Sequence, residues 1–302
     1  MNERKVDFAV KRTRKLDPLE NAMQLLFFLC GAVAVAFVLV ITVYLVVSGL
    51  PAIQKVGLGN FLLGTTWDSA NKTDPQYGIL PFILTSIYGT AGAILIGVPV
   101  GFMTAMFLAK AAPPKLAAVV RPAVDLLAGI PSVVYGMVGM VVLLPGIRGL
   151  FHLKAGDTLL AAILVLAVMI LPSIISVSEN ALRAVPREYE EASLALGATE
   201  METYFRVSAP AAKSGIAAAV VLGVGRAIGE AMAIMMVAGN AANMPGLFKS
   251  VKFLTTAVAS EMSYAADGSL QKMALFSIGL VLFLFIMMIN VFLNLVLKRE
   301  KE

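Results

Sequence analysis

The stretch PREYEEASLALGATEMETYFRVSAP, residues 186–210, is a polar segment that lies between two long apolar ones. Pro186 suits the first turn of a helix, because its missing N–H would be unpaired there in any case. Gly197 supplies the permissive backbone that ends a helix and lets the chain turn. Thr199 and Glu202 have the spacing of a capping box, which begins a second short helix. The stretch therefore predicts two helices joined by a glycine elbow, in a shape that fits a groove on a partner protein.

The rest of the chain is far more apolar than a soluble domain. Of its 302 residues, 59% are hydrophobic and 14% are charged, whereas charged residues make up about 25% of a typical soluble domain. Apolar stretches of about 18 residues or more with few charges are typical of membrane helices. The sequence predicts an all-α polytopic membrane protein with six transmembrane helices, at residues 23–47, 79–109, 122–144, 158–177, 211–239 and 273–297.

Lys and Arg residues are distributed unequally between the two sides of these spans. Sixteen of the 24 lie on the side that holds both termini and residues 178–210, seven lie on the other side, and Arg226 lies within a span. Because cytoplasmic loops carry an excess of Lys and Arg, we expect both termini and the polar stretch to face the cytoplasm. The net charge of +5 is then a consequence of membrane topology and does not indicate nucleic-acid binding.

The predicted fifth span contains two charged residues, within GVGRAIGEAMAIMMVAGN at residues 223–240. Arg226 lies near the middle of this span, where a charge costs about 2.5–3.5 kcal/mol on insertion scales. Glu230 follows four residues later, and we expect it on the same face of the helix. An ion pair along a helix contributes only about 0.2–0.5 kcal/mol, so a purely structural pair does not offset the cost. We therefore interpret Arg226 and Glu230 as functional residues.

Several kinds of chemistry are excluded by what the sequence lacks. It contains no G-x-x-x-x-G-K-[ST] motif, so we do not expect the chain to bind ATP through a P-loop of its own. Its single cysteine, Cys30, and single histidine, His152, cannot build an internal disulfide or a Cys/His metal site. No Ser/His/Asp or paired-carboxylate constellation is identifiable either. We expect no cofactor in this chain and no enzymatic activity of its own.

The polar stretch resembles the EAA loop of ABC importer permeases. EAS at residues 191–193 is followed after three residues by Gly197, and after nine more by VSAP at residues 207–210, which is the family's spacing for EAA, Gly and Ile-x-Leu-Pro. Three positions depart from the consensus letters, each to another small or apolar residue: Ser193, Val207 and Ala209. The resemblance implies a type I ABC importer permease fold with a cytoplasmic coupling helix. It also implies coupling to ATPase subunits through Glu190, Glu191, Ala192, Ser193 and Gly197.

Three further runs resemble the permeases of phosphate ABC importers, in particular the PstC type. They are YGILP at residues 77–81, PSVVYG at residues 131–136 and GRAIGEAMA at residues 225–233. The resemblance implies a subunit that translocates inorganic phosphate across the cytoplasmic membrane, with Arg226 and Glu230 on the substrate path. An Arg guanidinium fork suits phosphate oxygens. Ser132 and Tyr135 are further candidates for the path, although helix packing explains these polar side chains equally well.

The resemblance covers roughly residues 20–297 and implies several partners in the cytoplasmic (inner) membrane. These are a second permease subunit of the PstA type that forms a heterodimer, two ATP-binding subunits and an extracytoplasmic phosphate-binding protein. The expected division of this multi-pass chain is a cytoplasmic basic tail (1–22), the first transmembrane helix (23–47), an extracytoplasmic loop (48–78), a permease core of five transmembrane helices (79–297) that includes the EAA-type loop (178–210), and a cytoplasmic tail (298–302).

Other functions remain open at this point. A sulfate or molybdate ABC permease would share the EAA elbow and need an anion path, although the three phosphate-type runs argue against it. A secondary anion transporter could use Arg226 and Glu230 with proton coupling. It would predict internal repeats, which the sequence does not show, and it would leave the elbow without a purpose. A signalling role in phosphate sensing could accompany transport, but no residue indicates it.

Overall fold

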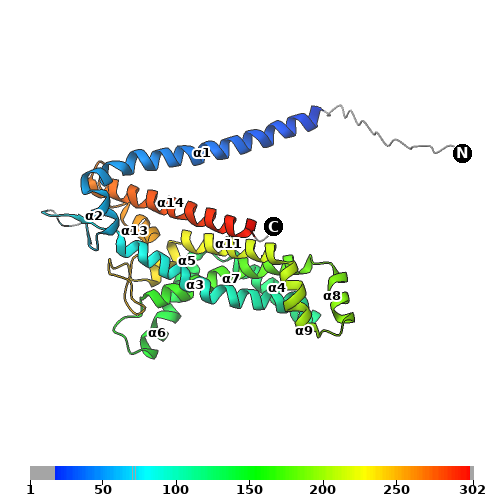
Figure 1. The fold of residues 1–302 in the computed structure, drawn as a ribbon. Coiled ribbons are helices and arrows are strands. Elements are labelled where there is room, and N and C mark those ends of the chain that lie inside the picture. The colour runs from blue at the N-terminus through cyan, green and yellow to red at the C-terminus, as the bar shows by residue number, and fades with distance from the viewer. Residues whose placement is uncertain (1–17, 70, 72, 300–302) are drawn as a thin grey trace. The chain divides into compact units, whose positions relative to one another are not determined.

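The computed structural model describes residues 18–69, 71 and 73–299 (Figure 1). Of the two predicted cytoplasmic tails, residues 1–17 and 300–302 lie outside this description. The described chain divides into two units, the first ending at Tyr44 and the second beginning at Leu45. All the elements discussed below, apart from the first part of α1, belong to the second unit.

The regular structure of the described residues is almost entirely helical. The one sheet among them is a two-stranded antiparallel hairpin, β1 (Trp67–Asp68) and β2 (Gln76–Tyr77), with Trp67 opposite Tyr77. The helices are α1 (Pro18–Val56), α2 (Leu58–Leu63), α3 (Leu80–Met106), α4 (Pro114–Gly129), α5 (Ser132–Val138), α6 (Leu144–Leu150), α7 (Leu159–Arg183), α8 (Arg187–Ala195), α9 (Glu200–Thr203), α10 (Ala209–Ala211), α11 (Lys213–Gly229), α12 (Met232–Val237), α13 (Leu254–Glu261) and α14 (Leu270–Arg299). Three π-helical turns join some of them: η1 (Phe107–Ala111), η2 (Gly139–Leu143) and η3 (Tyr204–Ser208).

Five helical stretches in the described part of the chain are long and apolar enough to cross a membrane. They cover residues 20–56, 80–111, 132–150, 159–183 and 270–291. A sixth is a pair of helical segments, residues 200–211 and 213–229, which meet at an angle of 73°. The predicted number of six spans is therefore reached only when this bent pair counts as one.

The predicted third span is displaced along the sequence. It was expected at residues 122–144, but α4 ends at Gly129 and a new helix begins at Ser132. The cause is Pro131, since a proline pushes the residue before it out of the helical region. Ile130 accordingly has an extended ψ of 128°. Two helices therefore replace the single one that the continuous apolar sequence suggested.

The predicted fifth span, residues 211–239, is likewise broken. Helix α11 ends at Gly229, and Glu230 has an extended backbone with φ −72° and ψ 131°. Helix α12 then begins at Met232. The break lies in the stretch that carries both charged candidates.

The centre of the second unit is the pair α3 and α7, which lie side by side (Figure 1). Glycines of α3 make this contact close: a Cβ atom at Gly97 would lie 2.6 Å from the Cδ1 atom of Ile170, and one at Gly101 would lie 2.7 Å from the Cγ2 atom of Ile174. Small residues let helix backbones approach in this way within a membrane. At one end of this pair lie α8 and α9, and at the other lie α2 and α6 (Figure 1).

Substituting Gly97 with Val tests the close packing of α3 on α7. The added side chain must displace Ile170, and overpacking of this kind costs about 1–3 kcal/mol. We expect a lower thermal denaturation temperature for the protein in detergent. Gly146→Val is the matched control, because a Cβ atom at Gly146 meets nothing within 4 Å. Equal denaturation temperatures for the two variants would contradict the packing.

Candidate functional site

Two short helices that follow the breaks, α5 and α12, pack against each other. The absence of a side chain at Gly136 makes room for α12, since a Cβ atom there would lie 3.0 Å from the Cα atom of Ala233. Three residues further along, at the start of η2, a Cβ atom at Gly139 would meet Val237. Because the contacts advance in the same direction on both helices, α5 and α12 run parallel. Their N-terminal ends, and so both breaks, lie on the same side.

Glu230 lies at the second break and bonds the helices that follow it. Its Oε1 atom accepts a hydrogen bond of 3.0 Å from the backbone N–H of Ala233, in the first turn of α12. Its main-chain carbonyl accepts a hydrogen bond of 2.7 Å from the hydroxyl of Thr255, at the start of α13. A carboxylate at this place satisfies an N–H that the helix leaves unpaired and suits the positive end of the helix dipole. Glu230, which precedes the N-cap residue Ala231, thus caps the first turn of α12 with its side chain.

Arg226 lies in the last turn of α11 and is half-buried. Its Nη1 atom donates to the hydroxyl of Ser173, in α7, at 3.5 Å. No ion pair joins Arg226 to a carboxylate within the described residues. The expectation that Glu230 shares its helical face was wrong, because the helix ends at Gly229 before Glu230 is reached. Among the described residues, the partner of the guanidinium is therefore a hydroxyl group and not an opposite charge.

The two other predicted path residues lie at the neighbouring break. Ser132 is the first residue of α5 and is half-buried. Tyr135 lies one turn further along, and its hydroxyl donates a hydrogen bond of 2.7 Å to the carbonyl of Leu127, so it bridges α4 and α5 across the break. Arg226 is near enough to act electrostatically on this tyrosine. The structure thus brings the four predicted residues to one region, while a role on a substrate path stays a prediction.

Sequence reasoning missed Ser173 and Thr255. Ser173 follows Pro172 inside an apolar span, and a hydroxyl at that depth is a signal that could have marked it, because such groups hydrogen-bond across helices. Thr255 carried no signal, since it lies in the first turn of α13, whose packing against Glu230 cannot be read from local sequence.

The predicted elbow is confirmed. Helix α8 begins directly after Pro186, and Gly197 has a positive φ of 87°. The capping box is complete, because the backbone N–H of Thr199 donates to the carboxylate of Glu202 at 3.0 Å and the N–H of Glu202 donates to the Thr199 hydroxyl at 3.3 Å. The local pattern alone was enough to define this shape.

The elbow exposes apolar side chains at its surface. Leu196, directly before Gly197, is 90% exposed. The other large apolar side chains exposed on this segment are Tyr189, Leu194, Met201 and Phe205. A group of exposed apolar side chains on an otherwise polar segment is typical of a surface that binds another protein.

The five predicted coupling residues differ in exposure. Glu191, Ala192 and Gly197 are exposed, whereas Ser193 is half-buried and shares a hydrogen bond of 2.9 Å with the hydroxyl of Thr203. Glu190 is turned toward the membrane-spanning part of the protein. Its Oε1 atom lies 2.5 Å from Nζ of Lys110, at the end of η1, and accepts a hydrogen bond of 2.7 Å from the hydroxyl of Ser208.

These partners also set the protonation of Glu190. Burial by itself raises the pKa of the Glu190 carboxyl, but the hydrogen bonds from Lys110 and Ser208 outweigh burial and hold the pKa below its ordinary value. The carboxylate is therefore charged at neutral pH, as an ion pair with Lys110 requires.

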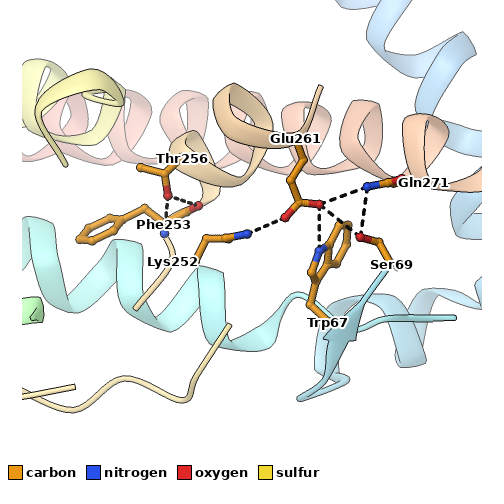
Figure 2. A network of polar contacts seen from close by, with 7 residues as sticks. All are labelled: Trp67, Ser69, Lys252, Phe253, Thr256, Glu261 and Gln271. Carbon is orange, nitrogen blue, oxygen red and sulfur yellow. Dashed lines mark hydrogen bonds and ion pairs between the residues drawn. The ribbon is translucent and has the colours of Figure 1, made fainter. Parts of the chain in front are cut away.

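A second polar network surrounds the carboxylate of Glu261 (Figure 2). The carboxylate of Glu261, the last residue of α13, lies 2.5 Å from Nζ of Lys252 and accepts a hydrogen bond of 3.1 Å from the indole N–H of Trp67. Ser69 and Gln271 donate to the same carboxylate at 3.3 and 3.4 Å. The network joins the hairpin β1–β2 to α13 and to the start of α14, so it fixes the helix whose other end holds Glu230 through Thr255.

Comparisons with known proteins identify the family of the chain. The chain matches the family of binding-protein-dependent transport system inner membrane components over residues 97–301. It is 40% identical to the probable ABC transporter permease protein YqgH of Bacillus subtilis, with 93% of this chain and 92% of that protein covered. It is 37% identical to the phosphate transport system permease protein PstC of Haemophilus influenzae, with 87% and 88% covered. Its fold is similar to a chain of the inward-facing MetNI methionine ABC transporter, with a TM-score of 0.58 and 21% identity over 74% of this chain and 95% of that one.

Replacing Glu230 with Ala tests the cap on α12. The variant leaves the N–H of Ala233 without its acceptor, and loss of such a cap costs about 0.5–2 kcal/mol. Glu230→Gln keeps an oxygen at the same place, so we expect it to denature at a temperature closer to that of the wild type. An equal effect of both substitutions would count against the capping role.

The pH dependence of stability tests the Lys110–Glu190 ion pair. Because the folded-state pKa of Glu190 is lowered, its contribution is complete above the ordinary glutamate pKa of about 4.3 and is lost as the pH falls through the lower folded-state pKa. We expect the difference in denaturation temperature between wild type and Glu190→Gln to be constant from pH 7 to about 5 and to shrink only in stronger acid. A difference that vanishes by about pH 6 would contradict this assignment.

Proposed function

Because the chain belongs to the family of binding-protein-dependent transport system inner membrane components, we propose that it is a permease subunit that carries inorganic phosphate across the cytoplasmic membrane. Members of this family are transport components and not enzymes. Relatives named as PstC phosphate permeases, at 31–37% identity, support phosphate as the substrate. So do the three phosphate-type runs of the sequence.

One observation carries the proposal: Arg226 lies within a span without a carboxylate partner among the described residues. An unneutralised charge at that depth is costly, so its retention favours a function that needs the charge. The guanidinium presents N–H groups in a fork that matches phosphate oxygens. With a single hydroxyl as its recorded partner, from Ser173, it keeps donors available for a passing anion.

The surroundings of Arg226 support an anion path beside the two breaks. Helix α5 continues through η2 and α6 as one helical stretch, residues 132–150, whose positive end lies at the break. Half-helices that end within a membrane are used in this way by other transporters to face anionic groups. We place Ser132 and Tyr135 beside this path as well.

The second charged residue, Glu230, has a different role in the proposal. It does not neutralise Arg226, because its carboxylate bonds the first turn of α12. It lies near enough in sequence to meet the same anion, and a carboxylate can accept a hydrogen bond from a protonated phosphate oxygen. Glu230 would thereby favour the protonated form of phosphate, which gives the path a preference over fully ionised sulfate.

ATP hydrolysis is assigned to partner subunits that dock on the elbow. Its exposed surface, with Leu196 at the tip, suits a hydrophobic groove on an ATPase. We propose Glu191, Ala192, Ser193 and Gly197 as the contact. The complete importer then contains a second permease subunit, two ATP-binding subunits and an extracytoplasmic phosphate-binding protein, with both termini of this chain in the cytoplasm.

Uptake of labelled phosphate by cells that express the whole transporter with Arg226→Gln tests the proposal. Hydrogen bonds to charged groups contribute about 1.5–3 kcal/mol, so we expect uptake to fall roughly tenfold or more, with the complex still assembled. Arg148→Gln, which changes an exposed arginine at the end of the span 132–150, should leave uptake unchanged.

Labelled sulfate serves as the second substrate in the same cells. Phosphate uptake that survives Arg226→Gln would remove Arg226 from the path. Sulfate uptake that exceeds phosphate uptake in the wild type would instead favour another oxyanion importer.

A further inference from the structure

The end of α3 nearest the elbow has backbone carbonyl groups that the helix itself cannot satisfy. After Met106 the chain enters the π-turn η1, and the N–H of Ala112 donates to Phe107. The next two residues are Pro113 and Pro114, which have no N–H to donate. The carbonyls of the last turn are therefore left for side chains from other elements.

Side chains from the neighbouring helices take these carbonyls. Leu108 accepts from Nη2 of Arg121, in α4, at 2.9 Å and from Nη2 of Arg183, in α7, at 3.4 Å. Both arginines also bond one oxygen of the buried Glu179, at 2.5 and 2.9 Å. These contacts fix the end of α3 to the membrane-spanning helices beside it.

Lys110 joins the same end of α3 to the elbow. Its carbonyl accepts a hydrogen bond of 3.2 Å from the hydroxyl of Tyr204, in η3. Its ammonium group pairs with Glu190, in α8, at 2.5 Å, and the two side chains are only 11% and 19% exposed. Sheltered from solvent and salt, this pair is screened less than a surface ion pair. Within the described residues it is the one ion pair that links α8 to a membrane span.

We propose that Lys110 is a positioning residue that transmits movement of α8 to the membrane-spanning helices through its ion pair with Glu190. The inference rests on the proposed function, an importer driven by ATPases that dock on the elbow. It also reassigns Glu190, which sequence reasoning placed on the ATPase contact, to the joint between the elbow and the second span.

The packing of α3 on α7 provides a route by which a displacement at Lys110 reaches α7. At Gly97 and Gly101, α3 packs so closely on Ile170 and Ile174 of α7 that no space is left for a Cβ atom. Close-packed elements of this kind move together. Helix α7 carries Ser173, which contacts Arg226. The elbow is thereby connected to the proposed phosphate path by two helices that act as one body.

The first experiment measures phosphate uptake and ATP hydrolysis on the same vesicles, which contain the complete transporter. The variants are Lys110→Gln, Glu190→Gln, the double variant and the charge swap Lys110→Glu with Glu190→Lys. We expect each single variant to assemble and hydrolyse ATP but to take up at least fivefold less phosphate per ATP. The double variant should be no worse than either single one, and the swap should restore at least half of the ratio.

Glu188→Gln is the matched control, because Glu188 lies in the same helix with an exposed side chain. It should leave the ratio of uptake to hydrolysis unchanged. Two results would overturn the inference: a ratio unaffected by Lys110→Gln, or a loss of assembly that the charge swap does not repair. The second result would mean that the pair serves packing alone.

A substrate-independent measurement separates this inference from the proposed function. Cys30 is the single cysteine of the chain, so Cys30→Ser with Ser132→Cys leaves one thiol in this chain, beside the proposed path, and its labelling is measured on this chain. Its rate of reaction with a water-soluble maleimide is compared without nucleotide and with ATP and vanadate. We expect nucleotide to change the rate severalfold when Lys110 is present and to have no effect in Lys110→Gln.

The two failures are then distinct. If wild-type vesicles do not take up phosphate, the proposed function is wrong, and the labelling still tests the ion pair. If the labelling responds to nucleotide equally with and without Lys110, the inference is wrong, whatever the substrate.

Discussion

The architecture depends on one constraint: a helix that breaks inside a membrane must have its backbone groups bonded by other parts of the protein. At Glu230 the side chain bonds the N–H of Ala233, and Thr255 bonds the carbonyl. At the neighbouring break, Tyr135 bonds the carbonyl of Leu127. Each residue that satisfies the backbone therefore also lies beside the place where the path is proposed, so the same side chains have structural and functional reasons to be there.

Buried charge is stabilised differently near the elbow and at Arg226. Near the elbow, Glu179 and Glu190 are each matched by basic side chains, so the charges stabilise a joint. Within the part of the chain that the structure describes, Arg226 has a hydroxyl partner and no carboxylate partner. A neutral partner holds the guanidinium in place without cancelling its charge, which is what binding and release of an anion require. The contrast is physical support for assigning transport to one region and mechanical connection to the other.

A feature could be predicted from the sequence when the residues that form it lie close together along the chain. The elbow depends on Pro186, Gly197 and a capping box, all within 25 residues, so local rules were sufficient. The apolar runs predicted the spans. Because the run at residues 122–144 is continuous, it did not indicate the break at Pro131. The cap at Glu230 and the pairing of Lys110 with Glu190 depend on contacts between distant segments, and no periodicity encodes them. For the proposed path, the signal in the residues themselves was the pair of charged side chains, Arg226 and Glu230, within an apolar stretch.

The network around Glu261 has a consequence for how the protein is made. Trp67 is separated by 194 residues from the carboxylate that its indole N–H binds. At a synthesis rate of about 5–20 residues per second, the indole leaves the ribosome roughly 10–40 s before its acceptor does. Until Glu261 has been synthesised, the indole N–H of Trp67 therefore lacks the acceptor that it has in the folded chain. Closure of this network is therefore a late event of biogenesis.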